Sequence, residues 1–205
     1  MKKFLILTAM IWALAINFAA PASAQNKQPN AKSAAPRTVT DFYLKLSAKY
    51  LHILEAIPNR RSLIKTEDTA NGYLRLESKD WEGWGEVALF KRANGSYVVA
   101  VTEYSCAPVC DGNLTFLDYK NGKWKELELL PRYTVGDLRT AFHGATGRQP
   151  DEDEMNEQVF ELPRKGREIT LKIGGIPVMG FLWQSDEFVS GMIYLRGDDG
   201  KTNQK

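Results

Sequence analysis

The sequence has few of the side chains that most metal and redox sites require. It contains 2 cysteines and 2 histidines among 205 residues. Two imidazoles are too few for a histidine-rich zinc site, and no H-E-x-x-H segment is present. We therefore expect no cofactor and no histidine-based metal site. His52 falls on or beside the apolar side of a predicted helix, which favours a partly buried structural histidine over a catalytic one.

Sequence signatures of nucleophilic and nucleotide chemistry are also missing. No G-x-S-x-G segment presents a serine, and no glycine-rich phosphate loop precedes a predicted helix. The acidic run 151–154 does not fit an EF-hand, because Asn156 and Leu162 stand where a loop starting at Asp151 needs glycine and glutamate. No catalytic motif is found, and the sequence favours a protein that is not an enzyme.

The first segment of the chain has the pattern of a cleavable signal peptide. Lys2 and Lys3 precede an almost wholly apolar run, Phe4–Ala20, and Ala22-Ser23-Ala24 supplies the small residues that signal peptidase recognises. A membrane anchor is the alternative, but the run is short for a span and no charged residue follows it closely. We predict a signal peptide over 1–24, cleavage before Gln25, and a periplasmic or secreted protein with no membrane span after cleavage.

The predicted exported part has no excess of charge. Since Lys2 and Lys3 are two of the 27 basic residues, 25 basic and 25 acidic residues remain. This balance gives no electrostatic reason to expect nucleic acid as a partner. Polar residues 25–37 predict a disordered leader, residues 38–196 a single β-rich domain of ordinary size, and residues 197–205 a polar tail.

Apolar spacing predicts one helix at the start of the domain. Phe42, Leu46, Tyr50 and Leu54 recur at intervals of four residues, with Thr40 as the expected N-cap and a stop before Pro58. A second, short helix is expected after Thr134, with a capping box at Thr134–Asp137 and Gly144 just past its end.

The remainder of the domain has the patterns of strands joined by short turns. Asn-Gly pairs at 94–95 and 121–122 lie between apolar or alternating segments, as type I′ hairpin turns require. The run 98–101 is apolar on both faces, which indicates a central strand covered on both sides. We predict an α+β fold, mostly an antiparallel meander with an N-terminal helix and one short central helix.

Cys106 and Cys110 lie in the connection between the two Asn-Gly hairpins. In an exported protein they predict a disulfide that holds this loop in one shape. Their spacing is similar to that of copper-delivery thioredoxin-like proteins, a resemblance limited to the two cysteines. This chain has neither the Pro after the second cysteine nor the strand–helix setting. The resemblance implies a thiol or copper handler with His143 as a candidate third ligand.

Trp81-Glu82-Gly83-Trp84-Gly85 is the most unusual aromatic segment. Exposed tryptophans beside carboxylates such as Glu82 and Glu86 suit sugar stacking, whereas core packing at a bulged strand entry explains the same residues without a ligand. The sequence favours core packing, because a β domain of this size needs large residues to close its ends, and sugar stacking is the alternative.

The sequence favours an exported binding or accessory module that recognises another macromolecule, such as an inhibitor or envelope protein. Loops on rigid scaffolds commonly carry recognition, and the cysteine loop is the best candidate. The expected partner is a protein; the alternatives are a carbohydrate-binding or cell-wall-acting protein and a periplasmic thiol or copper handler. The candidate binding residues are Ala107, Pro108, Val109, Asp111, Trp81 and Trp84.

Overall fold

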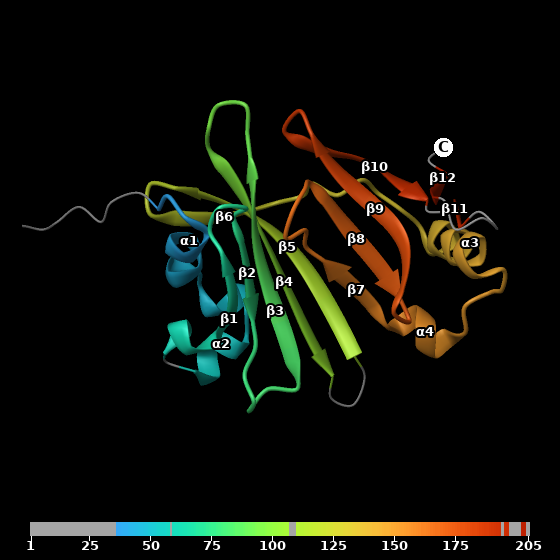
Figure 1. Ribbon diagram of the computed structural model, residues 1–205, viewed down its shortest axis with the longest axis horizontal. Coiled ribbons are helices and arrows are strands. Elements are labelled where there is room, and N and C mark those ends of the chain that lie inside the picture. Colours follow the sequence, from blue (N-terminus) through green and yellow to red (C-terminus); the bar gives the residue numbers. More distant parts are fainter. Residues whose placement is uncertain (1–35, 58, 107–109, 194, 197–201, 204–205) are drawn as a thin grey trace, which may run out of the picture. The chain divides into compact units, whose positions relative to one another are not determined.

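The fold is built from two antiparallel sheets, as the sequence predicts. The computed structural model describes residues 36–57, 59–106, 110–193, 195–196 and 202–203. Six strands pair in the order β1-β2-β3-β4-β5-β6, and four pair in the order β10-β9-β8-β7 (Figure 1). Every strand of these sheets neighbours the strand before or after it in sequence, so the predicted α+β meander is confirmed. The predicted signal peptide and its cleavage position lie outside the described residues.

The strand bounds show where each hairpin turns. The six-stranded sheet consists of β1 (Ile64–Asp68), β2 (Tyr73–Leu76), β3 (Gly83–Lys91), β4 (Tyr97–Cys106), β5 (Cys110–Lys120) and β6 (Lys123–Leu127). The four-stranded sheet consists of β7 (Gln158–Glu161), β8 (Glu168–Ile173), β9 (Ile176–Gln184) and β10 (Glu187–Ile193). A small third pair is formed by β11 (Leu195–Arg196) and β12 (Thr202–Asn203).

The predicted single helix before Pro58 is wrong in its continuity and its start. The segment forms α1 (Val39–Lys45), η1 (Ala48–Tyr50) and α2 (Ile53–Ala56), followed by η2 (Arg60–Leu63). Thr38, rather than Thr40, is the N-cap, in a capping box with Asp41.

Tertiary contacts end α1 where propensity alone would continue it. The Arg60 guanidinium donates to the carbonyls of Leu44 and Leu46, and Trp124 Nε1 donates to Lys45 O at 2.8 Å. These carbonyls therefore find partners in η2 and β6 instead of in a further helical turn.

The two Asn-Gly turns differ from each other. Asn121 (φ 53°) and Gly122 (φ 78°) both have positive φ, so this hairpin has the predicted type I′ turn. At 94–95 only Gly95 (φ 82°) does, and Arg92 N donates to Ser96 O across a three-residue loop. The type I′ assignment there is wrong, because one additional loop residue moves Asn94 out of the left-handed position.

Each face of the six-stranded sheet is covered by a separate apolar core. Helices α1 and α2 cover one face, and the four-stranded sheet lies against the other (Figure 1). Strand β4 contributes to both: Val99 and Val101 pack on the helix side, while Val98 and Ala100 face the second sheet. The prediction of a central strand covered on both sides is confirmed.

Helix α3 (Val135–Thr146) adds Leu138, Ala141 and Phe142 to the core that the second sheet shares. Its predicted capping box, Thr134 with Asp137, is confirmed. The predicted end at Gly144 is wrong: the helix continues to Thr146, and Gly147 (φ 78°) is the left-handed residue that ends it.

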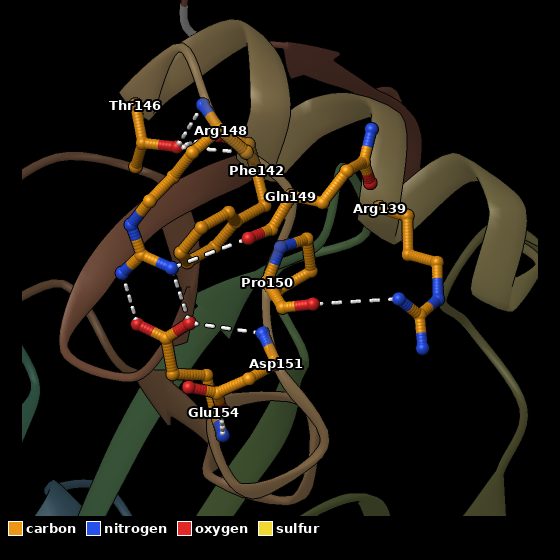
Figure 2. A network of polar contacts seen from close by, with 8 residues as sticks. All are labelled: Arg139, Phe142, Thr146, Arg148, Gln149, Pro150, Asp151 and Glu154. Atoms are coloured by element: carbon orange, nitrogen blue, oxygen red, sulfur yellow. Dashed lines mark hydrogen bonds and ion pairs between the residues drawn. The ribbon is translucent and has the colours of Figure 1, made fainter.

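A polar network connects α3 to the short helix α4 (Glu152–Asn156). Arg148 donates through both Nη atoms to the Glu154 carboxylate, and its guanidinium lies 5.1 Å from the Phe142 ring centroid (Figure 2). Glu154 also accepts the Asp151 backbone N–H at 3.1 Å, while Asp151 caps α4 by accepting Glu154 N–H at 2.8 Å. Asp151 and Glu154 of the acidic run therefore have structural partners.

Candidate recognition surface

One end of the six-stranded sheet brings together two segments that the sequence treats separately. The β4–β5 register sets Tyr104 opposite Gly112, and the β3–β4 register sets Trp84 opposite Tyr104. Strand β4 ends at Cys106 and β5 begins at Cys110 at this same end of the sheet; we call these two strand ends, with the segment that joins them, the cysteine hairpin. Trp84 and the strand ends that flank the predicted binding loop therefore belong to one region of the molecule.

The backbone register sets Cys106 directly opposite Cys110. Residues directly opposite in an antiparallel pair have Cα separations of about 4.5–5.5 Å, within the range that a disulfide spans. The disulfide itself stays a prediction, since the structure gives no side-chain description there. Of the candidate binding residues, Ala107, Pro108 and Val109 lie outside the described residues, and Asp111 is described in its backbone pairing alone.

Trp84 lies in a row of stacked side chains that crosses three strands. The Arg75 guanidinium, from β2, lies over the indole at 4.0 Å from the ring centroid. The Tyr104 ring, from β4, is stacked with it at 5.3 Å between centroids and an interplanar angle of 29°. Because β3 runs between β2 and β4, the two contacts cover opposite faces of the indole.

Gly112 allows this row to reach the second sheet. A Cβ at Gly112 would lie 3.7 Å from Tyr104 Cδ2 and 2.8 Å from Gln158 O. The second distance is too short for any side chain, so β7 approaches the β5 backbone because glycine stands there. We call Arg75, Trp84 and Tyr104 the stacked row; all three remain partly exposed.

Two carboxylates fix Arg75 in place. Arg75 Nε donates to Glu77 Oε1 at 3.1 Å, and Arg75 Nη1 donates to Glu86 Oε1 at 3.0 Å. The Glu86 side chain is 5% exposed, whereas that of Glu77 is 40% exposed. An arginine held at both ends and stacked on an indole has lost most of its rotamer freedom before any partner arrives.

Glu86 is the most buried acid of the region. It also accepts the Tyr73 hydroxyl proton at 2.7 Å and the Leu162 backbone N–H at 2.8 Å. Burial raises the pKa of Glu86, and the hydrogen bonds from Tyr73, Leu162 and Arg75 oppose that rise. Burial, with Glu86 beside it, also raises the pKa of Tyr73. Glu86 thus joins the sheets and anchors Arg75 rather than serving as an exposed sugar acceptor.

The Tyr104 hydroxyl marks the partly exposed end of the row. Burial raises the pKa of Tyr104, and the nearby Glu157 carboxylate raises it further. Glu157 is exposed, so this part of the surface carries negative charge close to the tyrosine.

Trp81 lies on the other face of the sheet and does not extend the stacked row. Its ring covers Gly83, where a Cβ would lie 2.9 Å from Trp81 Cε2. It packs at the edge of the helix-side core and is partly exposed. The two tryptophans therefore do not form one platform, and neither of them is fully buried in the core.

An open cavity of about 630 Å³ is lined in part by residues 77–80, which directly precede Trp81 in the sequence. The Trp81 backbone N–H donates to the carbonyl of Ser78, one of the lining residues, at 3.3 Å. Hydroxyl, ammonium and carboxylate groups surround the cavity; its lining residues are Ile57, Ser62, Lys65, Glu77, Ser78, Lys79 and Asp80.

Sequence reasoning missed the role of Glu103. Its carboxylate is buried and accepts the backbone N–H groups of His52 at 2.9 Å and Ile53 at 3.2 Å, at the start of α2. His52 Nδ1 lies 3.0 Å from the same carboxylate, and the His52 side chain is 71% exposed. The expectation of a partly buried histidine is wrong, because Glu103 holds the ring at the surface. The sequence does contain a signal for this role, because Glu103 is an acidic residue in a strand that begins with the apolar run 98–101.

The described residues contain no group of three or more His, Cys, Asp or Glu side chains arranged to hold a metal ion. What the region does offer is a surface of aromatic ring edges, a guanidinium held by two carboxylates and the paired ends of two strands. Such a surface suits recognition by contact.

Comparisons with known proteins leave the family of this chain open. No family model and no curated protein matches it. A solved domain of an uncharacterized protein from Porphyromonas gingivalis W83 is similar at 16% identity and a TM-score of 0.45, covering 72% of this chain and 94% of that chain. A likeness at this level carries no argument about function.

Within the described part of the chain, no helix combines the length and the apolar character needed to cross a bilayer.

Proposed function

We propose that this protein is an exported binding module that recognises a protein partner through the stacked row and the adjoining cysteine hairpin. One observation carries the proposal. Trp84 is held between Arg75 and Tyr104, is partly exposed, and belongs to neither of the two apolar cores. Export rests on the pattern of residues 1–24.

The chemistry of the row favours a protein partner. Trp, Tyr and Arg are the residue types that most often dominate binding energy at protein interfaces. Sugar stacking needs a free aromatic face, and both faces of Trp84 are covered by Arg75 and Tyr104. Ring edges, a phenol and a guanidinium remain for contact with a partner.

Preorganisation gives the second argument. The guanidinium of Arg75 is fixed by Glu77 and Glu86, and Trp84 is fixed by stacking. Binding to such groups loses less side-chain entropy than binding to free ones. A disulfide between Cys106 and Cys110 would order the neighbouring hairpin in the same way.

Cross-linking capture from the envelope fraction and medium of the producing organism tests this proposal. Wild-type protein is expected to capture a protein partner, and Tyr104→Ala and Trp84→Ala to reduce capture at least about tenfold. Tyr119→Ala is the matched control, since Tyr119 is a partly buried tyrosine that packs on the helix side of the same sheet. Each variant is compared at a temperature where circular dichroism shows it folded.

The hairpin is tested separately. Val109→Asp combined with Pro108→Ala is expected to weaken capture while leaving the melting temperature nearly unchanged. Capture that survives the row variants and the hairpin variant alike would overturn the proposal.

A carbohydrate is the second candidate ligand, and its supporting observation is the cavity lined in part by residues 77–80, which directly precede the partly exposed Trp81. The lining supplies hydroxyl groups from Ser62 and Ser78 and carboxylates from Glu77 and Asp80, which are suitable partners for sugar hydroxyls. Trp81→Ala would then abolish retention on a cell-wall polysaccharide column, while Trp84→Ala would not. Retention of both variants equal to wild type would exclude this candidate.

A further inference from the structure

A second cavity lies at the opposite end of the six-stranded sheet from the cysteine hairpin. It has a volume of about 300 Å³, at the lower end of the range for small-molecule sites. Its walls come from the β3–β4 hairpin, the residue that precedes β8, the end of β9 and the β9–β10 turn, so segments of both sheets contribute. The lining includes Lys91, Arg92, Arg167, Trp183, Ser185 and Asp186.

The floor of this cavity is rigid. Trp183 is 4% exposed, and its ring packs against Phe90 and Phe188 at centroid distances of 5.7 and 5.0 Å. Trp183 Nε1 donates to Lys91 O at 3.1 Å, and Trp183 N donates to Arg167 O at 2.8 Å. The backbone carbonyls of Lys91 and Arg167 therefore both accept hydrogen bonds from one buried residue, Trp183.

The β9–β10 turn is held in a conformation that its residues disfavour. Ser185 (φ 53°) and Asp186 (φ 70°) both occupy the left-handed region without being glycine. Residues other than glycine rarely adopt this conformation, and it persists where surrounding contacts hold it. Here the contact is Asp186 Oδ1, which accepts the Ala93 backbone N–H at 2.9 Å and so links the two hairpin tips.

The side chains around the cavity carry unbalanced positive charge. Arg92 is paired with Asp118 at 3.0 Å, and Asp186 accepts the Ala93 N–H. Among the described residues, neither the Lys91 ammonium nor the Arg167 guanidinium has a hydrogen-bond or ion-pair partner. Two unpaired cations and the Ser185 hydroxyl are donors beside a buried indole, and Asp186 is the only carboxylate among the lining residues.

We propose that this cavity binds a phosphate or sulfate ester group of a small ligand. Lys91 and Arg167 would neutralise the oxyanion, Arg167 in a bidentate geometry, with Ser185 donating a third hydrogen bond. The strained turn is explained by this role, because the link from Asp186 to Ala93 fixes the mouth of the cavity. The inference is independent of the stacked row, which lies at the other end of the sheet.

Titration of the full-length exported protein with inorganic phosphate and with inorganic sulfate, at constant ionic strength set with chloride, tests the proposal. Saturable amide shifts are expected at Ala93, Ser185 and Asp186 in heteronuclear NMR spectra. Lys91→Gln and Arg167→Gln are expected to weaken binding at least about tenfold each. Arg61→Gln and Lys125→Gln, which remove exposed cations elsewhere, are the controls and are expected to bind as wild type does.

Two further measurements separate site binding from a general charge effect. Asp186→Asn keeps an oxygen for Ala93 but removes a negative charge, so it is expected to bind both anions more tightly than wild type. With a phosphate monoester as titrant, tighter binding above a pH of about 6, where the monoester gains its second charge, with sulfate unaffected, would identify the phosphate ester as the preferred group. Absence of saturation, or equal loss in Arg61→Gln and Arg167→Gln, would overturn the proposal.

Discussion

Oε2 of Glu86 accepts the backbone N–H of Leu162 at 2.8 Å, so a side chain of the first sheet satisfies the backbone of the segment that follows β7. The same carboxylate accepts from Tyr73 and Arg75. One buried acid thus connects the packing of the two sheets to the stacked row. Three hydrogen-bond donors converge on this carboxylate, and they stabilise an ionisable group that is buried between the two sheets.

Replacing Glu86 by Gln is expected to destabilise the domain by about 1–3 kcal/mol, because the amide NH₂ must face at least one donor that Glu86 now accepts from. Burial raises the pKa of Glu86, so the folded state binds this proton more tightly than the unfolded state does. The free energy of unfolding of wild type should therefore exceed that of Glu86→Gln by most below a pH of about 4. This difference should decline as the pH rises through the pKa that Glu86 has in the folded state.

Urea unfolding of both proteins between pH 3 and 8 measures this difference, and the other carboxylates cancel because both proteins contain them. An advantage that grows with pH would mean that the Arg75 ion pair, rather than burial, dominates the titration of Glu86.

Gly122→Val and Gly95→Val should each lower the free energy of unfolding by about 1 kcal/mol or more. Both glycines have positive φ, and no atom lies within 4 Å of the position of an added Cβ, so the cost comes from the backbone conformation alone. Gly122→Asn should cost less, since Asn tolerates this region. Gly136→Ala, in α3 and without positive φ, is the opposite control and should be neutral or stabilising. Thermal melting measures all four, and unchanged melting in both Val variants would contradict the turn assignments.

Cys106 and Cys110 are expected to be bonded to each other in protein taken from an oxidising compartment. Alkylation without reductant should then label neither cysteine, whereas alkylation after reduction should label both. With so short a loop, the chain-entropy model gives the disulfide a contribution of only about 2 kcal/mol. Two free thiols, or one copper ion per chain after purification without added metal, would instead support the thiol or copper handler.

Glu154 should titrate well below an ordinary glutamate. The Arg148 ion pair, with the Asp151 backbone N–H, lowers its pKa to about 2. The stability it contributes is present above its unfolded pKa and is lost as the pH falls through about 2. Carboxyl carbon NMR measures the midpoint directly, and Arg148→Gln should move it back towards about 4.3. A wild-type midpoint near 4.3 would show that the contacts in Figure 2 do not persist in solution.

The sequence alone predicted those elements that are stabilised by residues close together in the chain. The capping box at Thr134 forms because hydroxyl and carboxylate stand three residues apart, and the turn at 121–122 forms because glycine follows asparagine between alternating strands. The apolar run 98–101 required cover on both faces, since side chains alternate along a strand. The meander then followed from short connections.

The tertiary structure alone decided the features that depend on contacts distant in sequence. The N-terminal helix breaks because Arg60 and Trp124 bind its last carbonyls, and Glu103 holds His52 at the surface from 51 residues away. The pairing of Trp84 with Arg75 and Tyr104, and the separation of Trp81 to the other face, follow from strand register. Sequence periodicity specifies which residues share a face of a strand. Which strands lie side by side, and therefore which side chains meet, is set by the packing of the whole chain.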